Sequence, residues 1–541
     1  MNGFIKANSF DPRLGNTYTE NGALSYGTFG SEIMNQFGHA GSARGREMSQ
    51  VWEDQNLLWA EDSAIGLMFP FYLRLITRKT DINGTKTQTP QRGAGNRDES
   101  FKRLLWIANY HPNAFYDNIW LLPVIGTWRD LWDIMVMAHD NNIKIDHSKL
   151  FDVIVNGLNN QSTCMLVKKY LPSIKSNNKC TTSRAATLNY LAKMFASRCL
   201  HLSYSEYRKM KATNGAQHFQ TVICARDYDA INWNEIPGKA LLKLATGKFL
   251  ERHDLEGRFI DWLDSKNNVT FNGFPYELVN KVAVNNNIIT KRLVDKQFEY
   301  LVSVGKEGGG AINGNVLCAL DTSGSMTSPI NEYGTTSYDV CIGLGVYFAE
   351  MNQGAFHNVV AMFDDTSELM TLKGTFSDKI LQIRHARTAW GSTNFQSLID
   401  LIVKTRKLHP EIPVEEFPQT LLVVSDMQFN PSSSYYNYSR SAQAEQTNYE
   451  TAMDKLREVF PSEFVDGFKI VWWQCANRNI NDFPSNMECG GTYVVSGFDG
   501  AVISFILGGE VNETTKNNKI KTMEEIIAEV FSQYIFNYMK F

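Results

Sequence analysis

Oxygen-bearing side chains gather at the end of one apolar run in this 541-residue chain. Residues 316–326 read Val-Leu-Cys-Ala-Leu-Asp-Thr-Ser-Gly-Ser-Met, so the run ends at Asp321, Ser323 and Ser325. A short apolar run bounded by turn residues is typical of a buried strand in a parallel sheet. Carboxylate and hydroxyl oxygens suit a hard divalent cation. Aspartate, serine and glycine are also ordinary turn residues, so this stretch alone leaves both interpretations open.

Two later loops add oxygen ligands of the same kind. Residues 390–394, Trp-Gly-Ser-Thr-Asn, precede a helical pattern and supply Thr393. Residues 420–426, Thr-Leu-Leu-Val-Val-Ser-Asp, form a second buried-strand pattern that ends at Asp426. Ligands of open α/β sheets bind beyond the carboxyl ends of the strands. We therefore expect three loops to bring these oxygens to one edge of a sheet.

The order Asp-x-Ser-x-Ser, Gly-x-Thr and Ser-Asp resembles the metal-ion-dependent adhesion site (MIDAS) of von Willebrand factor A domains. The resemblance implies five metal-site residues, some binding directly and some through water: Asp321, Ser323, Ser325, Thr393 and Asp426. Mg²⁺ is the expected cofactor, with Mn²⁺ or Ca²⁺ as alternatives, because Mg²⁺ demands near-octahedral geometry and keeps waters. One position would remain for an outside oxygen. A Rossmann-like domain with polar loops and no metal is the alternative.

Composition indicates the cellular compartment of the protein and the charge of its possible partners. Hydrophobic residues make up 43% of the chain, and the eight cysteines form no C-x-x-C pair, which favours reduced thiols and a cytoplasmic location. We find no signal peptide and no apolar run of about 20 residues. Residues 311–541 carry 16 Lys and Arg against 27 Asp and Glu, whereas residues 1–310 carry 37 against 30. This asymmetry favours the N-terminal part for a polyanion, although a chance surplus also accounts for it.

Helical periodicity dominates the first part of the chain, and strand–helix alternation dominates the second. We predict an irregular arm over 1–25, a helical domain over 26–305, a Gly-rich linker over 306–314, and an A-type domain with a C-terminal helix over 315–541. The predicted helices of the first domain are 49–76, 98–110, 118–122, 127–138, 147–169, 183–200, 203–213, 239–252, 256–264 and 288–304. Short helices in series are typical of an α-solenoid. The fold class is therefore α plus α/β, with a HEAT-like solenoid or ring followed by a doubly wound, mostly parallel sheet.

A basic, Gly-containing loop at 77–103 interrupts the helical pattern. Guanidinium groups and backbone amides in such a loop can contact phosphates. The candidate RNA-binding residues are Arg78, Lys79, Arg92, Arg97, Lys102 and Arg103. An ordinary solvated loop is the alternative.

Residues 91–112 and 121–132 contain Arg-Gly-x-Gly-x-Arg and Gly-x-Trp-x-Asp-Leu pieces. These pieces resemble the helical part of TROVE-type proteins, which include the Ro ribonucleoprotein autoantigen, and they are most similar to a related, largely uncharacterised family. In Ro proteins a ring of helical repeats is closed by an A domain. The resemblance implies a ribonucleoprotein that holds small or misfolded RNA, with single-stranded ends threading the ring.

Sequence signatures of catalysis are missing. There is no G-x-S-x-G, H-E-x-x-H or Walker A sequence, and we expect no enzyme activity. Asp364 and Asp365 could activate a metal-bound water, but a solvated acidic loop explains them equally. The leading hypothesis is a non-catalytic RNA-binding protein with a MIDAS. The alternatives are a metal-dependent assembly factor that captures an acidic protein without nucleic acid, and a metal-dependent hydrolase.

Overall fold

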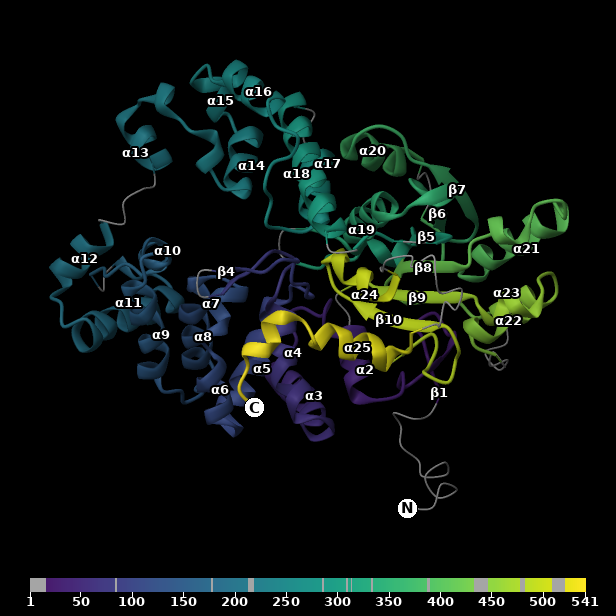
Figure 1. The fold of residues 1–541 in the computed structure, drawn as a ribbon, viewed down its shortest axis with the longest axis horizontal. Coiled ribbons are helices and arrows are strands. Elements are labelled where there is room, and N and C mark those ends of the chain that lie inside the picture. Colours follow the sequence, from purple (N-terminus) through teal and green to yellow (C-terminus); the bar gives the residue numbers. More distant parts are fainter. Residues whose placement is uncertain are drawn as a thin grey trace. The chain divides into compact units, whose positions relative to one another are not determined.

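The computed structural model describes residues 16–82, 85–176, 179–212, 218–284, 287–307, 310–312, 314–331, 334–386, 390–432, 446–476, 482–507 and 521–541. The chain divides into two compact units, each built from separate segments. The sheet unit comprises Met1–Gly45, Ala94–Asn96 and Lys266–Phe531. The helical unit comprises Arg46–Gly93, Arg97–Ser265 and Ser532–Phe541. Figure 1 shows their elements along the chain.

A six-stranded sheet forms the centre of the sheet unit (Figure 1). Its strands lie in the order β10-β9-β8-β5-β6-β7, and every pairing is parallel except that of β6 with β7. Their bounds are β5 Val316–Asp321, β6 Val359–Phe363, β7 Ser367–Thr371, β8 Thr420–Ser425, β9 Lys469–Gln474 and β10 Thr492–Ser496. The predicted mostly parallel sheet is confirmed. Every residue of β5 and β8 is buried, as central parallel strands require.

Helices cover both faces of this sheet. On one face, Trp473 of β9 packs against Phe348 of α19, with ring centroids 4.9 Å apart. On the other face, Trp472 packs against Phe395, which precedes α21, at 5.0 Å. The helices of this unit are α2 Glu32–His39, α17 Pro275–Val284, α18 Ile288–Lys306, α19 Ser337–Met351, α20 Phe376–Ala386, α21 Gln396–Leu408, α22 Asn448–Arg457, α23 Ser462–Asp466, α24 Ile503–Leu507 and α25 Met523–Phe531. Adjacent strand residues point to opposite faces, so the two tryptophans anchor the two helical layers.

The strand order reverses between β5 and β8. After β5 the chain adds β6 and β7 on one side, and it then returns to add β8, β9 and β10 on the other. Such a reversal is a topological switch point, where the loops leaving two neighbouring parallel strands diverge and open a crevice. Of the candidate metal residues, Asp321 ends β5 and Asp426 directly follows β8.

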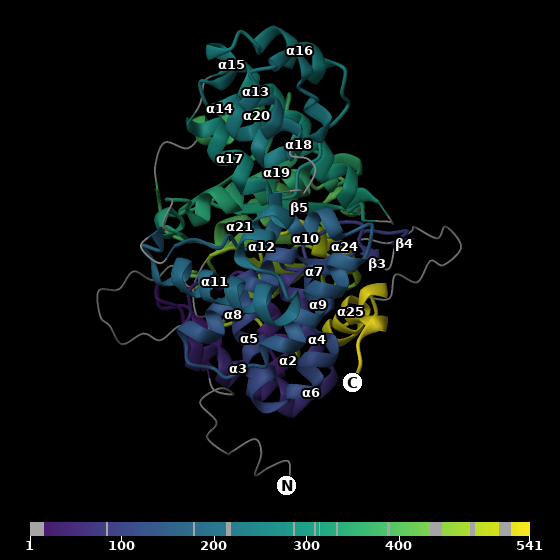
Figure 2. The ribbon, with the colours of Figure 1, turned by 90° about the vertical axis from the view of Figure 1, so that its left-hand side faces the viewer.

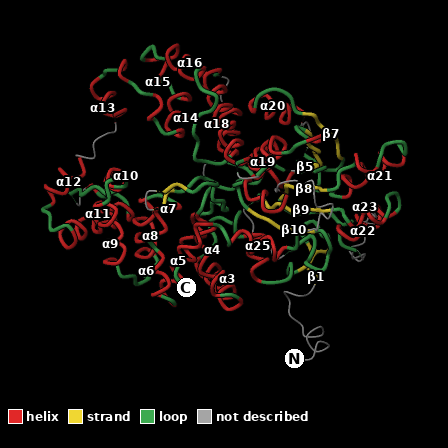
Figure 3. Tube along the Cα trace, in the orientation of Figure 1, coloured by secondary structure: helices red, strands yellow, loops and turns green. Residues whose placement is uncertain are grey.

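The helical unit contains one short hairpin, formed by β3 Asp81–Ile82 and β4 Thr85–Lys86, and is otherwise helical in its described parts (Figure 3). The helices α3, α4 and α5 pack against one another (Figure 2). The bounds are α3 Met48–Glu61, α4 Ser63–Arg74, α5 Arg97–Tyr110, α6 Pro112–Asn118, α7 Leu121–Ile125, α8 Trp128–Asp140, α9 His147–Asn159, α10 Cys164–Tyr170, α11 Ser183–Met194, α12 Tyr204–Ala212, α13 His218–Ala225, α14 Gly238–Thr246, α15 Phe249–Arg252 and α16 Glu256–Asp264.

Several predicted elements differ from those observed. The helix predicted over 49–76 is two helices, because Asp62 leaves helical geometry and its side chain accepts the N–H of Ile65 as the cap of α4. The units also divide elsewhere than the predicted 305/306 boundary. The segment Lys266–Phe531, with α17 and α18, belongs to the sheet unit, and Ser532–Phe541 belongs to the helical unit. Residues 1–15 of the predicted arm, and 308–309 and 313 of the predicted linker, lie outside the described residues.

Packing explains why α17 and α18 belong with the sheet. A Cβ on Gly343 of α19 would lie 3.0 Å from the backbone nitrogen of Tyr276, so α17 lies directly against α19. Phe298 of α18 stacks on Phe376 of α20 with ring centroids 4.1 Å apart. All eight cysteines are free thiols. Within the described ranges, no helix combines the length and hydropathy that a membrane span requires.

Candidate metal centre

Two aspartates lie at the switch point of the sheet. Asp321 is the last residue of β5, and Asp426 directly follows β8. The strands are neighbours in parallel register, with Leu320 opposite Val424, so the two carboxylates follow at the same edge. Both side chains are fully buried. The sequence prediction that these loops converge is therefore confirmed for this pair.

The proximity of the two carboxylates changes their electrostatics. Burial, and then the charge of Asp426, raise the pKa of Asp321 to about 7. Hydrogen bonds donated by Ser323 and Ser425 oppose this shift only in part. Two buried like charges repel each other unless a proton or a cation lies between them. The edge of the sheet therefore favours a positive charge at this point.

The turn after β5 is organised around Asp321. The backbone N–H of Ser323 donates to Asp321 Oδ1 at 2.9 Å, and the hydroxyl oxygens of Ser323 and Ser325 lie 3.1 Å apart. The N–H of Gly324 donates to the carbonyl of Gly391 at 2.9 Å. This last bond ties the Asp-x-Ser-x-Ser turn to the loop that carries Thr393.

The Thr393 loop is held by two acidic residues from the end of β6. Asp364 Oδ2 accepts the N–H of Gly391 at 3.2 Å. Asp365 Oδ1 accepts the N–H of Ser392 at 3.0 Å and its hydroxyl at 2.5 Å, and these bonds lower the pKa of Asp365. Thr393 itself is buried. Asp364 and Asp365 therefore position the loop.

One residue of the site belongs to the Ser-Asp piece of the motif but is not among the five predicted metal-site residues. Ser425, the last residue of β8, donates its hydroxyl to Asp321 Oδ2 at 2.5 Å and accepts the N–H of Met427 at 2.9 Å. It links the two aspartate loops and is fully buried. Its place directly before Asp426, in the Ser-Asp piece, is the signal for it in the sequence.

A hairpin of β1 Asn16–Tyr18 and β2 Leu24–Tyr26 packs beside the Asp426 loop, although 1–25 were predicted to be irregular. Thr19 donates its hydroxyl to the carbonyl of Phe429 at 2.7 Å, and the N–H of Glu20 donates to Gln428 Oε1 at 2.6 Å. The N–H of Gln428 in turn donates to Asp426 Oδ1 at 3.2 Å. The hairpin thus supports the loop that orients Asp426.

The donor set fits a hard cation. Two carboxylates and three hydroxyls contribute only oxygen, as Mg²⁺ prefers. Among the described residues, no group of three or more His, Cys, Asp and Glu side chains is arranged to hold a metal ion, so the candidate site depends on its hydroxyl oxygens as well as its two carboxylates. The buried like charges of Asp321 and Asp426 supply the electrostatic reason for a cation.

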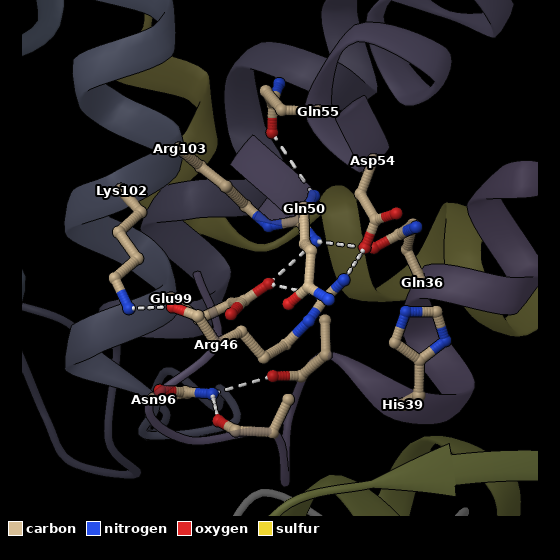
Figure 4. Close-up of polar contacts among 12 residues, drawn as sticks. Gln36, His39, Arg46, Gln50, Asp54, Gln55, Asn96, Glu99, Lys102 and Arg103 are labelled. Atoms are coloured by element: carbon tan, nitrogen blue, oxygen red, sulfur yellow. Dashed lines mark hydrogen bonds and ion pairs between the residues drawn. The ribbon is translucent and has the colours of Figure 1, made fainter. Parts of the chain in front are cut away.

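Two of the predicted RNA-binding arginines are internal. Arg103 is fully buried, and its Nη2 lies 3.0 Å from Glu99 Oε1 and 3.7 Å from Asp54 Oδ2 (Figure 4). Arg46 pairs with the same two acids. Arg92 is also buried. Arg92 and Arg103 are therefore internal residues of the helical unit rather than surface residues.

The other four predicted residues are more accessible. Arg78 Nη2 donates to the carbonyls of Val124 at 2.9 Å and Gly126 at 2.8 Å. Lys102 pairs with Asp98 at 2.8 Å. Lys79 is exposed, and Arg97 is 41% exposed. The six residues thus do not form one surface, and RNA contact by them stays a prediction.

Comparison with known proteins gives two matches without assigned function. A family described as a domain of unknown function (DUF7788) matches residues 315–534, which begin just before β5. The uncharacterized protein L728 of Acanthamoeba polyphaga mimivirus is 24% identical over 534 residues, which cover 91% of this chain and 85% of that protein. The matched family region contains all five candidate metal residues.

Proposed function

We propose that the sheet unit is a von Willebrand factor A-type domain whose MIDAS binds a divalent cation, most suitably Mg²⁺, and through it a partner. The observation that carries this function is the placement of Asp321 and Asp426, both fully buried, at the ends of two adjacent parallel strands. Asp321, Ser323, Ser325, Thr393 and Asp426 would hold the ion, directly or through water. A bound ion would supply a Lewis-acidic position for one oxygen of the partner.

The chain's own polar groups beside the site support its loops. The hydroxyl of Ser425 donates to Asp321, and Asp365 accepts the hydroxyl of Ser392. Asp364 is likewise hydrogen-bonded to the Thr393 loop. We therefore propose a non-catalytic binding function. A metal-dependent hydrolase is the alternative that turnover lost in Asp426→Asn would support.

Two partner chemistries can place an anionic oxygen at such a site. An acidic side chain of another protein would make this an assembly factor, and a phosphate oxygen would link it to RNA, as the Ro resemblance implies. Trp390 is 49% exposed beside the Thr393 loop and packs edge-on against Tyr338 with centroids 5.0 Å apart. An exposed aromatic beside a metal site offers contact area to either partner. RNA binding by the helical unit is the second candidate function, supported by its basic surplus of 29 Lys and Arg against 23 Asp and Glu.

Metal titration of the full chain tests the proposal. We expect Mn²⁺ and Mg²⁺ to bind with 1:1 stoichiometry in calorimetry, and both Asp321→Asn and Asp426→Asn to abolish binding. Asp400→Asn is the matched control, because Asp400 is an exposed aspartate of the same unit that pairs with Lys455 on the surface. Binding retained in both variants, or lost equally in the control, would contradict the assignment.

Partner capture separates the two chemistries. Single-stranded and structured RNA should be measured at two salt concentrations, with Mg²⁺ and with chelator, because phosphate contacts make affinity fall steeply with salt. Salt-sensitive RNA binding would support the Ro-like function. Metal-dependent capture of an acidic protein that fails in Asp321→Asn, without RNA binding, would support the assembly factor.

A further inference from the structure

Three arginines of the helical unit converge on one carboxylate. Arg129 Nε lies 3.3 Å from Asp133 Oδ2. Arg97 and Arg184 also form ion pairs with Asp133, one with each carboxylate oxygen. Asp133 is buried, so the three guanidinium groups surround a covered negative charge.

A second carboxylate, Asp130, lies in the same cluster, but the two carboxylates do not neutralise the charge of the arginines. Arg74 donates to Asp130 Oδ2 from Nε at 2.9 Å and from Nη2 at 2.6 Å, and Arg97 Nε lies 3.1 Å from Asp130 Oδ1. Four guanidinium groups therefore face two carboxylates, which leaves a formal charge of +2. We call these six residues, Arg74, Arg97, Arg129, Asp130, Asp133 and Arg184, the arginine cluster.

The surplus charge of the arginine cluster reaches solvent. The side chains of Arg97, Arg129 and Arg184 are 41%, 57% and 45% exposed, whereas those of Asp130 and Asp133 are 1% and 6% exposed. Arg129 uses only Nε, and Arg184 only Nη2, for bonds within the described part of the chain. Each thus keeps guanidinium donors for an outside acceptor.

Positive charges crowd one another in the arginine cluster. Burial lowers the pKa of Arg97 to about 10, Asp130 opposes this shift, and the other three guanidinium groups lower the pKa further. Three helices also begin at the cluster, since Arg97 opens α5 and the second residues of α8 and α11 are Arg129 and Arg184. The positive ends of three helix dipoles add to the four guanidinium charges.

Both sequence pieces that resemble the uncharacterised family supply this cluster. The Arg-Gly-x-Gly-x-Arg piece ends at Arg97, and the Gly-x-Trp-x-Asp piece runs from Gly126 to Asp130 through Arg129. A Cβ on Gly126 would lie 2.1 Å from Asp130 Oδ2 and 2.8 Å from Arg74 Nη2. Glycine is therefore required for the ion pair behind the exposed arginines.

We propose that Arg97, Arg129 and Arg184 form a binding site for a phosphate group carried as a dianionic monoester. Guanidinium groups bind phosphate oxygens with paired, charge-assisted hydrogen bonds. The formal charge of the cluster, +2, matches one dianion, and three side chains converging on a point suit a single terminal phosphate better than a long backbone. Free phosphate compounds and the 5′-phosphate end of an RNA share this chemistry. The site lies wholly in the helical unit, so its test is independent of the test of the metal centre.

Calorimetric titration of the full chain with inorganic phosphate at low salt tests the site. We expect binding that weakens about tenfold or more in Arg129→Gln and in Arg184→Gln, since each removes charge-assisted bonds. Arg198→Gln is the matched control, because Arg198 is exposed near the end of the same helical segment as Arg184 and lies outside the cluster. Phosphate binding that is missing in the native chain, or equal in all four proteins, overturns the proposal.

A substitution that should strengthen phosphate binding distinguishes an effect on the site from a general loss of folding. Asp133→Asn removes a competing carboxylate and raises the formal charge of the cluster to +3, so phosphate should bind more tightly. A folded Asp133→Asn protein with weaker binding would overturn the site, and if this variant unfolds, the two arginine variants decide.

Oligonucleotides identify the source of the phosphate. A 5′-phosphorylated RNA that binds more tightly than its 5′-hydroxyl counterpart, with the difference lost in Arg184→Gln, assigns the site to RNA ends. Phosphate binding without this difference assigns it to small phosphate compounds. Equal, Arg184-dependent binding of both RNAs, with inorganic phosphate unable to compete, would replace the monoester site by a backbone contact and refute the proposal.

Discussion

Replacing Asp426 by asparagine should change stability in opposite directions with and without a divalent cation. The pKa of Asp321 is raised to about 7, against about 3.9 for a free aspartate. A difference of about 3 units makes the ionised form more costly by about 4 kcal/mol in the folded state. Burial is the larger cause and the Asp426 charge the second, so we assign about 1–2 kcal/mol to repulsion by Asp426. Above about pH 8 without metal, Asp426→Asn should be the more stable protein by this amount.

The stability difference between Asp426→Asn and the native protein without metal depends on pH. Because folding raises the pKa of Asp321, its contribution to stability is fully present below the unfolded value of about 4 and is lost as pH rises to about 7. The advantage of Asp426→Asn should therefore vanish near pH 4, where folded Asp321 is protonated. The amide retains an acceptor for the N–H of Gln428, so the loop bond survives.

A bound metal should reverse the order of stability. Magnesium at about 100 times its dissociation constant would stabilise the native protein by about 2.7 kcal/mol, and the variant, with one ligand charge removed, should gain little. Differential scanning calorimetry in chelator and in Mg²⁺ measures both comparisons. If Asp426→Asn destabilises the protein equally in both conditions, Asp426 has a structural role alone and the electrostatic reasoning is wrong.

Three further substitutions test the structural reasoning. Glu99→Gln leaves fully buried Arg103 without its nearest charged partner and should cost about 3 kcal/mol in urea unfolding; a cost below about 1 kcal/mol would show that Asp54 suffices. Gly126→Ala forces a methyl group against the Asp130 carboxylate and should lower the free energy of unfolding by about 1–3 kcal/mol, whereas a neutral result would contradict the close approach. Burial raises the pKa of Asp295, so Asp295→Asn should raise the melting temperature at neutral and higher pH but not near pH 4; lower stability at every pH would mean that its hydrogen bonds dominate.

Strong local patterns were sufficient to locate the strands that carry the candidate metal site. The strand pattern at 420–426 is confirmed as β8, and the predicted helices 98–110 and 256–264 are confirmed as α5 and α16 within one residue. Continuous apolar runs mark central parallel strands clearly. The edge strand β7, Ser367–Thr371, was missed, because it is half-exposed and carries no such run.

Long-range contacts determine the features that local sequence patterns could not predict. The hairpin over Asn16–Tyr26 is fixed by bonds to Gln428 and Phe429, about 400 residues away, and nothing local predicts it. The sequence predicts one basic loop at 77–103, but the burial of its side chains depends on partners elsewhere in the chain. Arg103 is internal because Glu99 and Asp54 enclose its charge, whereas Arg97 joins Arg129 and Arg184 from two other helices. The sequence could reveal the charges but not how they are grouped.

The segmented composition of the two units has a consequence for synthesis on the ribosome. The N–H of Gly41, just after α2, donates to Ser496 Oγ at 2.9 Å, across 455 residues of chain. At about 5–20 residues per second, translation of that interval takes roughly 20 to 90 seconds. The helix α2, which buries Met34 and Phe37, packs against β10, so an early-made part of the sheet unit waits for a strand that is made much later. The apolar face of α2 must stay soluble through that delay, while the intervening helical segments are already free to fold.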